Sequence, residues 1–374
     1  MSPLAQRNLF HDKVRLAVTL TGVAFAVVLI VIEMGLYFGF TKTISSLIDH
    51  SQADLWVAAE SVPYLELGAP FHERKLYQIK GVPGVADVQK FIRRNQVWSR
   101  PDGQQWIIQV VGFNPDSGMG GPWKMVEGNV HDLKIPDGVI VDEFYKNKLG
   151  VSGIGDVFEI NGHRARVVGF SRGIRSFTTE PYIFTDIRHA QDFVSVPENQ
   201  TIFLLVKTEP GADVGSVRRA ISERVKDVTV FTTKDFGWRT QHYWTFTTGA
   251  GVAILLGAVL GLVVGFVVVA QTIYATTIDH LKEFGTLKAM GAPNSYVYKV
   301  ILTQAAIAAV LGYGLGLIIS IVVVVYAQPA GAPILLNWWI VLATFLTTLA
   351  MCGGAAVISI QKVTRLDPAM VFKG

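Results

Sequence analysis

Two long stretches of this chain contain no Asp, Glu, Lys or Arg: residues 240–278 and residues 300–361. Between residues 42 and 239, charged residues recur far more often. A helix that spans a bilayer needs about 20 apolar residues, and a charge at the bilayer centre costs at least about 2.5–3.5 kcal/mol on insertion scales. The two stretches therefore predict a membrane protein, and the second is too long for a single crossing.

We expect four transmembrane helices, one near the start of the chain and three near its end: residues 16–40, 249–274, 300–326 and 335–360. The third and fourth are separated by residues 327–334, a short extracytoplasmic loop that contains the helix-breaking residues Pro and Gly. The first span is far longer than the apolar region of a signal peptide, about 7–15 residues, and no small-residue cleavage site follows it. We therefore expect the first span to be retained.

The placement of charges predicts the orientation of these spans. Residues 41–248 hold 24 basic and 24 acidic residues, so this segment is neutral. Short loops rich in Lys and Arg stay in the cytoplasm, which predicts a cytoplasmic position for the amphipathic segment 1–15, the connection 275–299 and the tail 361–374. The net charge of +4 then reflects topology and contact with anionic lipid headgroups of the bilayer, and not nucleic-acid binding. The nine basic residues outside the neutral segment all flank span ends: Arg7, Lys13, Arg15, Lys282, Lys288, Lys299, Lys362, Arg365 and Lys373.

Residues 41–248 are long enough to form an extracytoplasmic domain with its own core. Two amphipathic segments, 71–79 and 214–225, predict helices. Runs rich in β-branched and aromatic residues predict nine strands: residues 55–59, 85–98, 106–113, 139–141, 157–160, 165–170, 182–184, 202–207 and 228–232.

The order of these elements predicts the fold class. A β-α-β-β pattern over residues 54–113 and a β-α-β pattern over residues 201–232 would form one split layer, and the mostly β block between them an insertion. The expected fold is a membrane α-helical protein with four transmembrane helices and a large extracytoplasmic α+β domain, a split β-α-β layer plus a β-rich insertion. Residues 41–54 would extend the first span as a stalk helix. An aromatic run before the second span predicts an interfacial belt and a second stalk helix: Trp238, Tyr243, Trp244 and Phe246.

No set of residues indicates catalysis. The segment Gly169-Phe170-Ser171-Arg172-Gly173 matches the nucleophile pattern G-x-S-x-G, but residues 174–183, which should be helical, are typical of loop and strand. The eight histidines are scattered without metal-ligand spacing, and no P-loop occurs. We therefore predict no catalytic residue, no metal and no cofactor in this chain, and interpret Cys352 as a small packing residue inside the fourth span.

Glycines line one face of the second span, at Gly257, Gly261 and Gly265. Small residues at this spacing let helices approach closely. The face is expected to pack against another helix of the same chain or against a second copy of it, and flexible bending of the helix is the alternative.

Glu33 is the one charged residue within the first span. An ionisable side chain inside a membrane is by default a candidate functional site, here a possible substrate contact. The alternative is that Glu33 lies near the outer end of its helix and reaches water or a Thr or Tyr partner. Both interpretations remain open.

The connection between the second and third spans contains an amphipathic segment, residues 277–292, with Gly285 as a hinge and Gly291 at its end. Apolar residues on a short exposed helix suit the groove of a partner protein. The residues predicted to contact that partner are Asp279, Lys282, Glu283, Phe284, Gly285, Leu287 and Lys288.

These residues carry a family resemblance. The run KEFGTLKAMGA, followed by an apolar helix with Gly312-x-Gly314-x-Gly316, resembles the signature of FtsX/MacB-type (type VII) ABC transporter permeases. The closing RLDPAMVFKG is similar to the family pattern R-x-x-P-A-x-x-L-R, and Arg7-Asn8-Leu9 matches its W-R-N-L start. The resemblance covers the whole chain in order, and the length without a fused ATPase is most similar to the DevC-like subgroup. Glu33 departs from the family, where an uncharged residue is expected.

The resemblance implies a permease subunit in the bacterial plasma (inner) membrane, with both termini cytoplasmic. It implies two copies of a separate ABC ATPase that binds ATP and Mg, and a second copy of this permease. A periplasmic membrane-fusion adaptor and an outer-membrane channel are the further partners it suggests. The implied function is export of a lipid, peptide or amphipathic small molecule, driven by movement of the stalks and outer domain. An FtsX-like scaffold that regulates a cell-wall hydrolase without transport is the alternative, and a membrane-anchored enzyme is a third class.

Overall fold

The computed structural model describes residues 13–178, 180–279, 283, 285–286, 290 and 293–364. The chain divides into two compact units. The membrane unit comprises the residues up to Phe40 and from Gly249 onward, and the outer unit is Thr41–Thr248. The outer unit thus covers the same residues as the expected extracytoplasmic domain.

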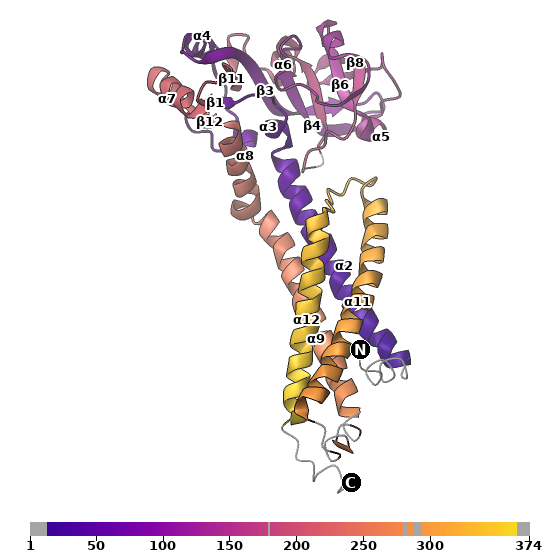
Figure 1. The fold of residues 1–374 in the computed structure, drawn as a ribbon. Coiled ribbons are helices and arrows are strands. Elements are labelled where there is room, and N and C mark those ends of the chain that lie inside the picture. Colours follow the sequence, from indigo (N-terminus) through magenta and orange to yellow (C-terminus); the bar gives the residue numbers. More distant parts are fainter. Residues whose placement is uncertain are drawn as a thin grey trace. The chain divides into compact units, whose positions relative to one another are not determined.

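Four long apolar helices build the membrane unit (Figure 1): α2 (Lys13–Ile44), α9 (Ala250–Asp279), α11 (Asn294–Ala327) and α12 (Trp338–Thr364). Each is long and apolar enough to cross a membrane. The connection between the second and third spans was expected to cover residues 275–299. It is shorter in the structure, because α9 continues to Asp279 and α11 begins at Asn294. Pro293 directly precedes α11, at a position where the missing backbone N–H is not needed.

Several hydroxyl groups buried in the membrane unit are satisfied within their own helices. The hydroxyls of Thr277, Ser320 and Thr344 each donate a hydrogen bond to the backbone carbonyl four residues earlier, over 2.7–2.8 Å. Thr348 and Ser359 make the same contact. Because lipid offers no hydrogen bonds, this pattern lets hydroxyls lie inside the bilayer without lining a water-filled path.

The connection between α11 and α12 folds back onto the outer part of α2. The backbone N–H of Leu335 donates to the carbonyl of Gly35 over 3.0 Å. A side chain at Gly39 would overlap the carbonyl oxygen of Pro333. Two glycines of α2 therefore make room for this short loop.

The outer unit is organised around one ten-stranded sheet in the order β12-β1-β11-β3-β4-β9-β6-β8-β5, in which β7 pairs with both β3 and β8. A two-stranded sheet pairs β10 with β2. The strands are β1 (Leu55–Ala59), β2 (Phe71–His72), β3 (Val85–Ser99), β4 (Gln105–Phe113), β5 (Met125–Glu127), β6 (Gly138–Asp142), β7 (Val157–Ile160), β8 (His163–Ser171), β9 (Tyr182–Asp186), β10 (Gln200–Thr201), β11 (Phe203–Thr208) and β12 (Val228–Thr232).

Strand β3 belongs to both halves of this sheet. Its first part pairs with β11 and its second part with β4. On the β11 side, β12, β1, β11 and β3 are antiparallel, and the helices α4 (Arg74–Lys80) and α7 (Val214–Arg224) complete the expected split layer. Apolar residues such as Val57, Val206 and Ile221 form the core beneath these helices. The β-rich insertion contributes the other strands, so the predicted fold class is confirmed.

Two expectations about local structure are wrong. Residues 71–79 do not form one helix, because Phe71 and His72 pair with Thr201 and Gln200 as strand β2. The stalk helix over residues 41–54 is interrupted at Ser45, between α2 and the short helix α3 (Ser46–Asp49). At the C-terminal end of the outer unit, α8 (Thr233–His242) passes into a π-helical turn, Tyr243–Thr247.

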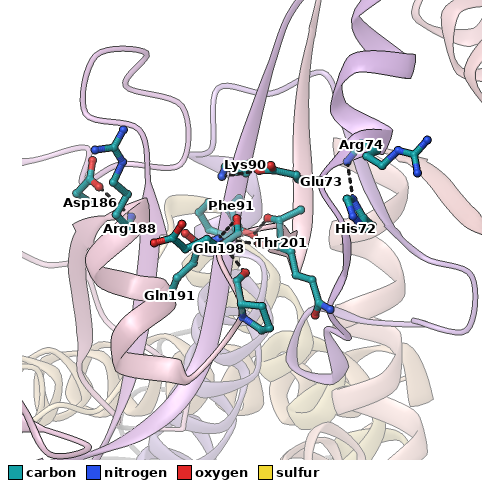
Figure 2. A network of polar contacts seen from close by, with 12 residues as sticks. His72, Glu73, Arg74, Lys90, Phe91, Asp186, Arg188, Gln191, Glu198 and Thr201 are labelled. Carbon is teal, nitrogen blue, oxygen red and sulfur yellow. Dashed lines mark hydrogen bonds and ion pairs between the residues drawn. The ribbon is translucent and has the colours of Figure 1, made fainter.

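A polar network anchors the helix α6 (Ile187–Val194), which the sequence did not predict (Figure 2). The side-chain amide of buried Gln191 donates to the backbone carbonyls of Pro197, Glu198 and Gln200 over 2.8–3.3 Å. The buried hydroxyl of Thr201 lies 2.9–3.2 Å from two strand carbonyls. These contacts hold the loop after α6 against the sheet.

Candidate functional site

The predicted glycine face of α9 is covered by α2 of the same chain. A Cβ atom at Gly261 would lie 2.9 Å from Leu29 Cβ, and one at Gly265 would overlap Ala26. Both glycines are buried. The absence of a side chain is therefore what lets α2 and α9 touch, and at Gly261 and Gly265 this face is not available to a second copy of the protein.

A second glycine pair packs on another side of α2. Side chains at Gly312 and Gly316 of α11 would come within 2.6 Å of Val23 Cβ and 2.7 Å of Val27 Cβ, respectively. Gly314, between them, has no atom within 4 Å of the position a Cβ would take. Helix α2 is thus held closely by both α9 and α11.

Glu33 occupies the end of the α2–α9 contact. A Cβ atom at Gly257 would lie 2.8 Å from Glu33 Cδ and 2.9 and 3.0 Å from its two carboxylate oxygens. The carboxylate therefore rests on the backbone of Gly257. The two candidate residues that the sequence singled out for different reasons, one as a substrate contact and one as a packing glycine, are neighbours.

No described residue pairs with the carboxyl group of Glu33. Over the described part of the chain, its carboxylate takes part in no hydrogen bond and no ion pair. Its side chain is partly exposed, as is Gly257, whereas Gly261 and Gly265 are buried. The contact between α2 and α9, called the seam below, is therefore buried at Gly261 and Gly265 and partly exposed at Gly257 and Glu33.

The predicted partner-binding segment is described only in part. Asp279 is the exposed last residue of α9. Glu283 and Gly285 are helical, Glu283 exposed and Gly285 buried. The other four predicted residues of the segment lie outside the described residues: Lys282, Phe284, Leu287 and Lys288.

Ser171, the serine of the G-x-S-x-G pattern, has a structural role. It is the last residue of β8 and is fully buried, and its hydroxyl donates to Asp142 Oδ2 over 3.1 Å. The same carboxylate accepts the backbone N–H groups of Ile174 and Phe144. Burial raises the pKa of Asp142, while these hydrogen bonds act in the opposite direction. The group ties a turn together and presents no exposed nucleophile.

A buried polar cluster in the outer unit was not predicted. Arg93 Nε donates to Gln109 Oε1 over 3.1 Å, and both side chains are buried on neighbouring strands. The amide nitrogen of Gln109 lies 2.9–3.1 Å from oxygen atoms of Ser176, Thr178 and Glu180. This cluster fixes the loop that leads into β9.

The cluster extends to the π-helical turn that ends the outer unit. Trp244 Nε1 donates to Glu66 Oε2 over 3.0 Å, and Tyr243 stacks on Tyr64 with ring centroids 3.7 Å apart. Burial raises the pKa of Glu66, and the charge of Arg93 acts against that rise. Two of the four residues predicted to form an interfacial belt therefore pack within the outer unit. No sequence signal could have found the cluster, because its members are distant in the chain.

The described residues include no group of three or more His, Cys, Asp or Glu side chains placed to hold a metal ion. The two groups of ionisable side chains that stand out are the membrane carboxylate Glu33 and the buried cluster around Arg93.

Two family models match the chain. The MacB-like periplasmic core domain matches residues 16–224, and the FtsX-like permease C-terminal domain matches residues 255–368. The ABC transporter permease Rv2563 of Mycobacterium tuberculosis is 23% identical over 367 residues, which cover 96% of this chain and 95% of that protein. The ABC transporter permease YtrF of Bacillus subtilis is 23% identical over 261 residues, covering 62% of this chain and 58% of that protein.

Among solved structures, the outer unit is similar to the periplasmic region of MacB from Actinobacillus actinomycetemcomitans, with 10% identity and a TM-score of 0.39 over 49% of this chain and 90% of that one. The extracellular domain of the transporter YknZ from Gram-positive bacteria gives 15% identity and a TM-score of 0.38 over 48% and 99%. The family assignment rests on the sequence matches, which span both units: the chain belongs to the FtsX/MacB-type family of ABC transporter permeases.

Proposed function

We propose that this permease is the membrane subunit of an exporter in the bacterial inner membrane, with both termini in the cytoplasm. An ABC permease works with an ATPase subunit. In the proposed assembly, two copies of a separate ATPase act on two copies of this permease. ATP hydrolysis moves the outer units, and a lipid, peptide or amphipathic small molecule is passed outward, to a membrane-fusion adaptor and an outer-membrane channel.

The observation that carries this proposal is how the outer unit is joined to the spans. One connection, between Phe40 and Thr41, lies inside helix α2. The other, between Thr248 and Gly249, comes directly before α9. We propose that a displacement of these spans is passed to the outer unit through these two connections.

The second connection differs from the first. It consists of the π-helical turn Tyr243–Thr247 followed by Gly249, whose φ of +77° is a conformation that other residues rarely adopt. π-Helical turns are uncommon and often mark functional positions. We propose that α2 acts as the stiff connection and that residues 243–249 form the hinge.

The interior of the membrane unit supports movement of the outer unit over conduction through an aqueous channel. Glycines bring α2 into close contact with α9 and α11, and the buried hydroxyls of Thr277, Ser320 and Thr344 bond to their own helices. The ATPase would apply force at residues 275–299, through Phe284 and its neighbours.

A linker insertion tests the proposal. A Gly-Ser-Gly-Ser insertion between Phe40 and Thr41 should leave ATP hydrolysis by the reconstituted complex intact and abolish the nucleotide-dependent distance change between spin labels on the two outer units. The same insertion after Gly211, in an exposed turn of the outer unit, is the control. If the distance change survives the insertion at Thr41, the mechanical coupling is wrong.

Copurified partners separate export from the scaffold function. An adaptor retained with the permease and its ATPase supports export. A cell-wall hydrolase retained in its place supports the FtsX-like scaffold, and export is then excluded.

A further inference from the structure

Glu33 lies well inside the membrane unit. Its carboxylate rests against Gly257, seven residues after the start of α9 at Ala250, which corresponds to a depth of about 10 Å along that helix. Side chains on a helix tilt toward its N-terminus. Since α2 runs toward the outer unit, the side chain of Glu33 is directed away from the nearer aqueous surface. Reaching water by extension of the side chain is therefore disfavoured.

The chain itself supplies no cation at this depth. The spans hold no Lys or Arg over residues 16–41, 240–278 and 300–361. Along α2 the nearest basic residue toward the outer unit is Lys42, nine positions on, or about 13 Å of helix. A second copy of the protein has the same spans, so it would bring another carboxylate and no positive charge. An ionised Glu33 therefore finds no counter-charge among the spans, and a cation on a different molecule would supply one.

Gly257 shapes the place where such a molecule would bind. A methyl group at this position would come within 2.8–3.0 Å of the three terminal atoms of the Glu33 side chain, closer than real Cβ atoms are found. Beside it, Leu256 and Leu260 are 56% and 63% exposed and form an apolar surface on the same helix. Tyr37 lies one helical turn after Glu33, on the same side of α2, and an aromatic face attracts cations. Carboxylate, aromatic ring and apolar surface together suit a cationic head with an apolar tail.

We propose that the open end of the α2–α9 seam, formed by Glu33 and Gly257, binds the cationic amine head of an amphiphile, whose apolar tail lies along α9. This inference rests on the proposed export function and deepens it by naming a substrate class. The carboxylate holds the ammonium group, and the absence of a side chain at Gly257 lets the carboxylate lie against α9. The amine belongs either to a membrane lipid or to a free amphiphile.

Binding of dodecylammonium to the full-length permease in nanodiscs, without the ATPase, tests the site directly. Glu33→Gln should weaken binding at least about tenfold, equivalent to about 1.4 kcal/mol, and leave binding of neutral dodecanol unchanged. Glu223→Gln, which removes an exposed carboxylate from the outer unit, should leave both unchanged. Wild-type affinity of Glu33→Gln for dodecylammonium, or equal losses for the charged and neutral probes, would overturn the proposal.

Glycine variants provide a second test that does not alter charge. Gly257→Ala should weaken dodecylammonium binding severalfold, because the added methyl group displaces the carboxylate. Gly314→Ala, where a Cβ meets no atom within 4 Å, should not. Equal effects of the two substitutions would show that helix packing in general, and not this site, controls binding.

The lipid composition of the nanodiscs distinguishes a lipid amine from a free cationic amphiphile. If nanodiscs that contain phosphatidylethanolamine weaken dodecylammonium binding relative to phosphatidylglycerol alone, the natural occupant is a lipid amine. If they do not, it is a free cationic amphiphile. A change of oligomeric state in Glu33→Gln with unchanged probe binding would instead assign Glu33 to a contact between copies and refute the site. Because the ATPase is absent, these results stand apart from the linker test: loss of mechanical coupling there leaves the binding site unaffected.

Discussion

The indole nitrogen of Trp244 donates a hydrogen bond to Glu66 over 3.0 Å, although 178 positions separate the two residues. Trp244 lies in the π-helical turn at the end of the outer unit, and its ring also meets Phe177 edge-on with centroids 4.7 Å apart. A single side chain thus joins the proposed hinge to two distant loops of the same unit. Changes at this contact are expected to alter both the stability of the outer unit and the freedom of the hinge.

Trp244→Phe should destabilise the outer unit by about 1–3 kcal/mol, because the Glu66 carboxylate loses its donor while most of the ring contact remains. Thermal unfolding of the full-length protein, followed by circular dichroism, measures the loss. Trp238→Phe is the matched control, since Trp238 is 59% exposed, and it should have almost no effect. Equal melting temperatures for the two variants would contradict a role for the hydrogen bond.

Glu66 should make the outer unit less stable as pH rises. Burial raises the pKa of Glu66 above its usual value in the folded state. The contribution of Glu66 to the free energy of unfolding is complete below the unfolded-state pKa, about 4.3. This contribution is lost as pH rises through the higher folded-state pKa. Glu66→Gln removes this loss, so the variant should gain stability relative to wild type between pH 4 and pH 8. Parallel melting curves across that range would refute the assignment.

Asp54 should behave in the opposite sense. Burial raises its pKa, but hydrogen bonds from the backbone and hydroxyl of Thr208 and from Lys207 outweigh burial and lower it overall. The stabilisation is present above the unfolded-state pKa, about 3.9, and is lost as pH falls through the lower folded-state value. Asp54→Asn should therefore cost stability at pH 7 and little at pH 3. Melting temperatures of the two proteins should converge on acidification.

Gly261→Leu should disturb folding of the membrane unit and not its association. The site is filled by Leu29 of the same chain, and forcing extra atoms into a packed contact costs about 1–3 kcal/mol. Thermal stability in detergent should fall, while native mass spectrometry should show the wild-type oligomeric state. Dissociation without loss of stability would mean that the glycine face contacts a second copy after all.

Phe284→Asp should uncouple the ATPase from the outer unit. The prediction comes from the amphipathic sequence around Phe284, whose apolar residues suit a partner's groove. The variant should insert normally but hydrolyse ATP without the nucleotide-dependent movement of the outer units. Full coupling in a variant that still copurifies with its ATPase would disprove the docking role.

Most strands of the outer unit could be predicted because each is marked by a short run of β-branched and aromatic residues. Strands β7 and β12 have the predicted bounds, and β3 differs by one residue at its end. Strand β2 was missed because two residues carry no periodicity, and its pairing partner, β10, lies far along the chain. Helix α6 was missed because it has only eight residues.

The candidate site was predictable as separate residues but not as a site. Sequence spacing showed that Gly257 permits close approach, and composition showed that Glu33 is unusual. Neither pattern shows which helix meets which, since that depends on packing among four spans of similar apolar character. The buried cluster around Arg93 had no local signal, because its charge is balanced by residues from other strands and loops.

The pairing of β1 imposes an order on the biogenesis of the protein. Both neighbours of β1, strands β11 and β12, are synthesised more than 140 residues after it. At about 5–20 residues per second, β1 is synthesised about 7–30 seconds before β11, and both of its edges stay open during that time. This half of the sheet can close only once β12 has been made, shortly before synthesis reaches α9. Slowing synthesis between β3 and β11 should therefore leave the nascent outer unit unfolded for longer and expose it to proteases.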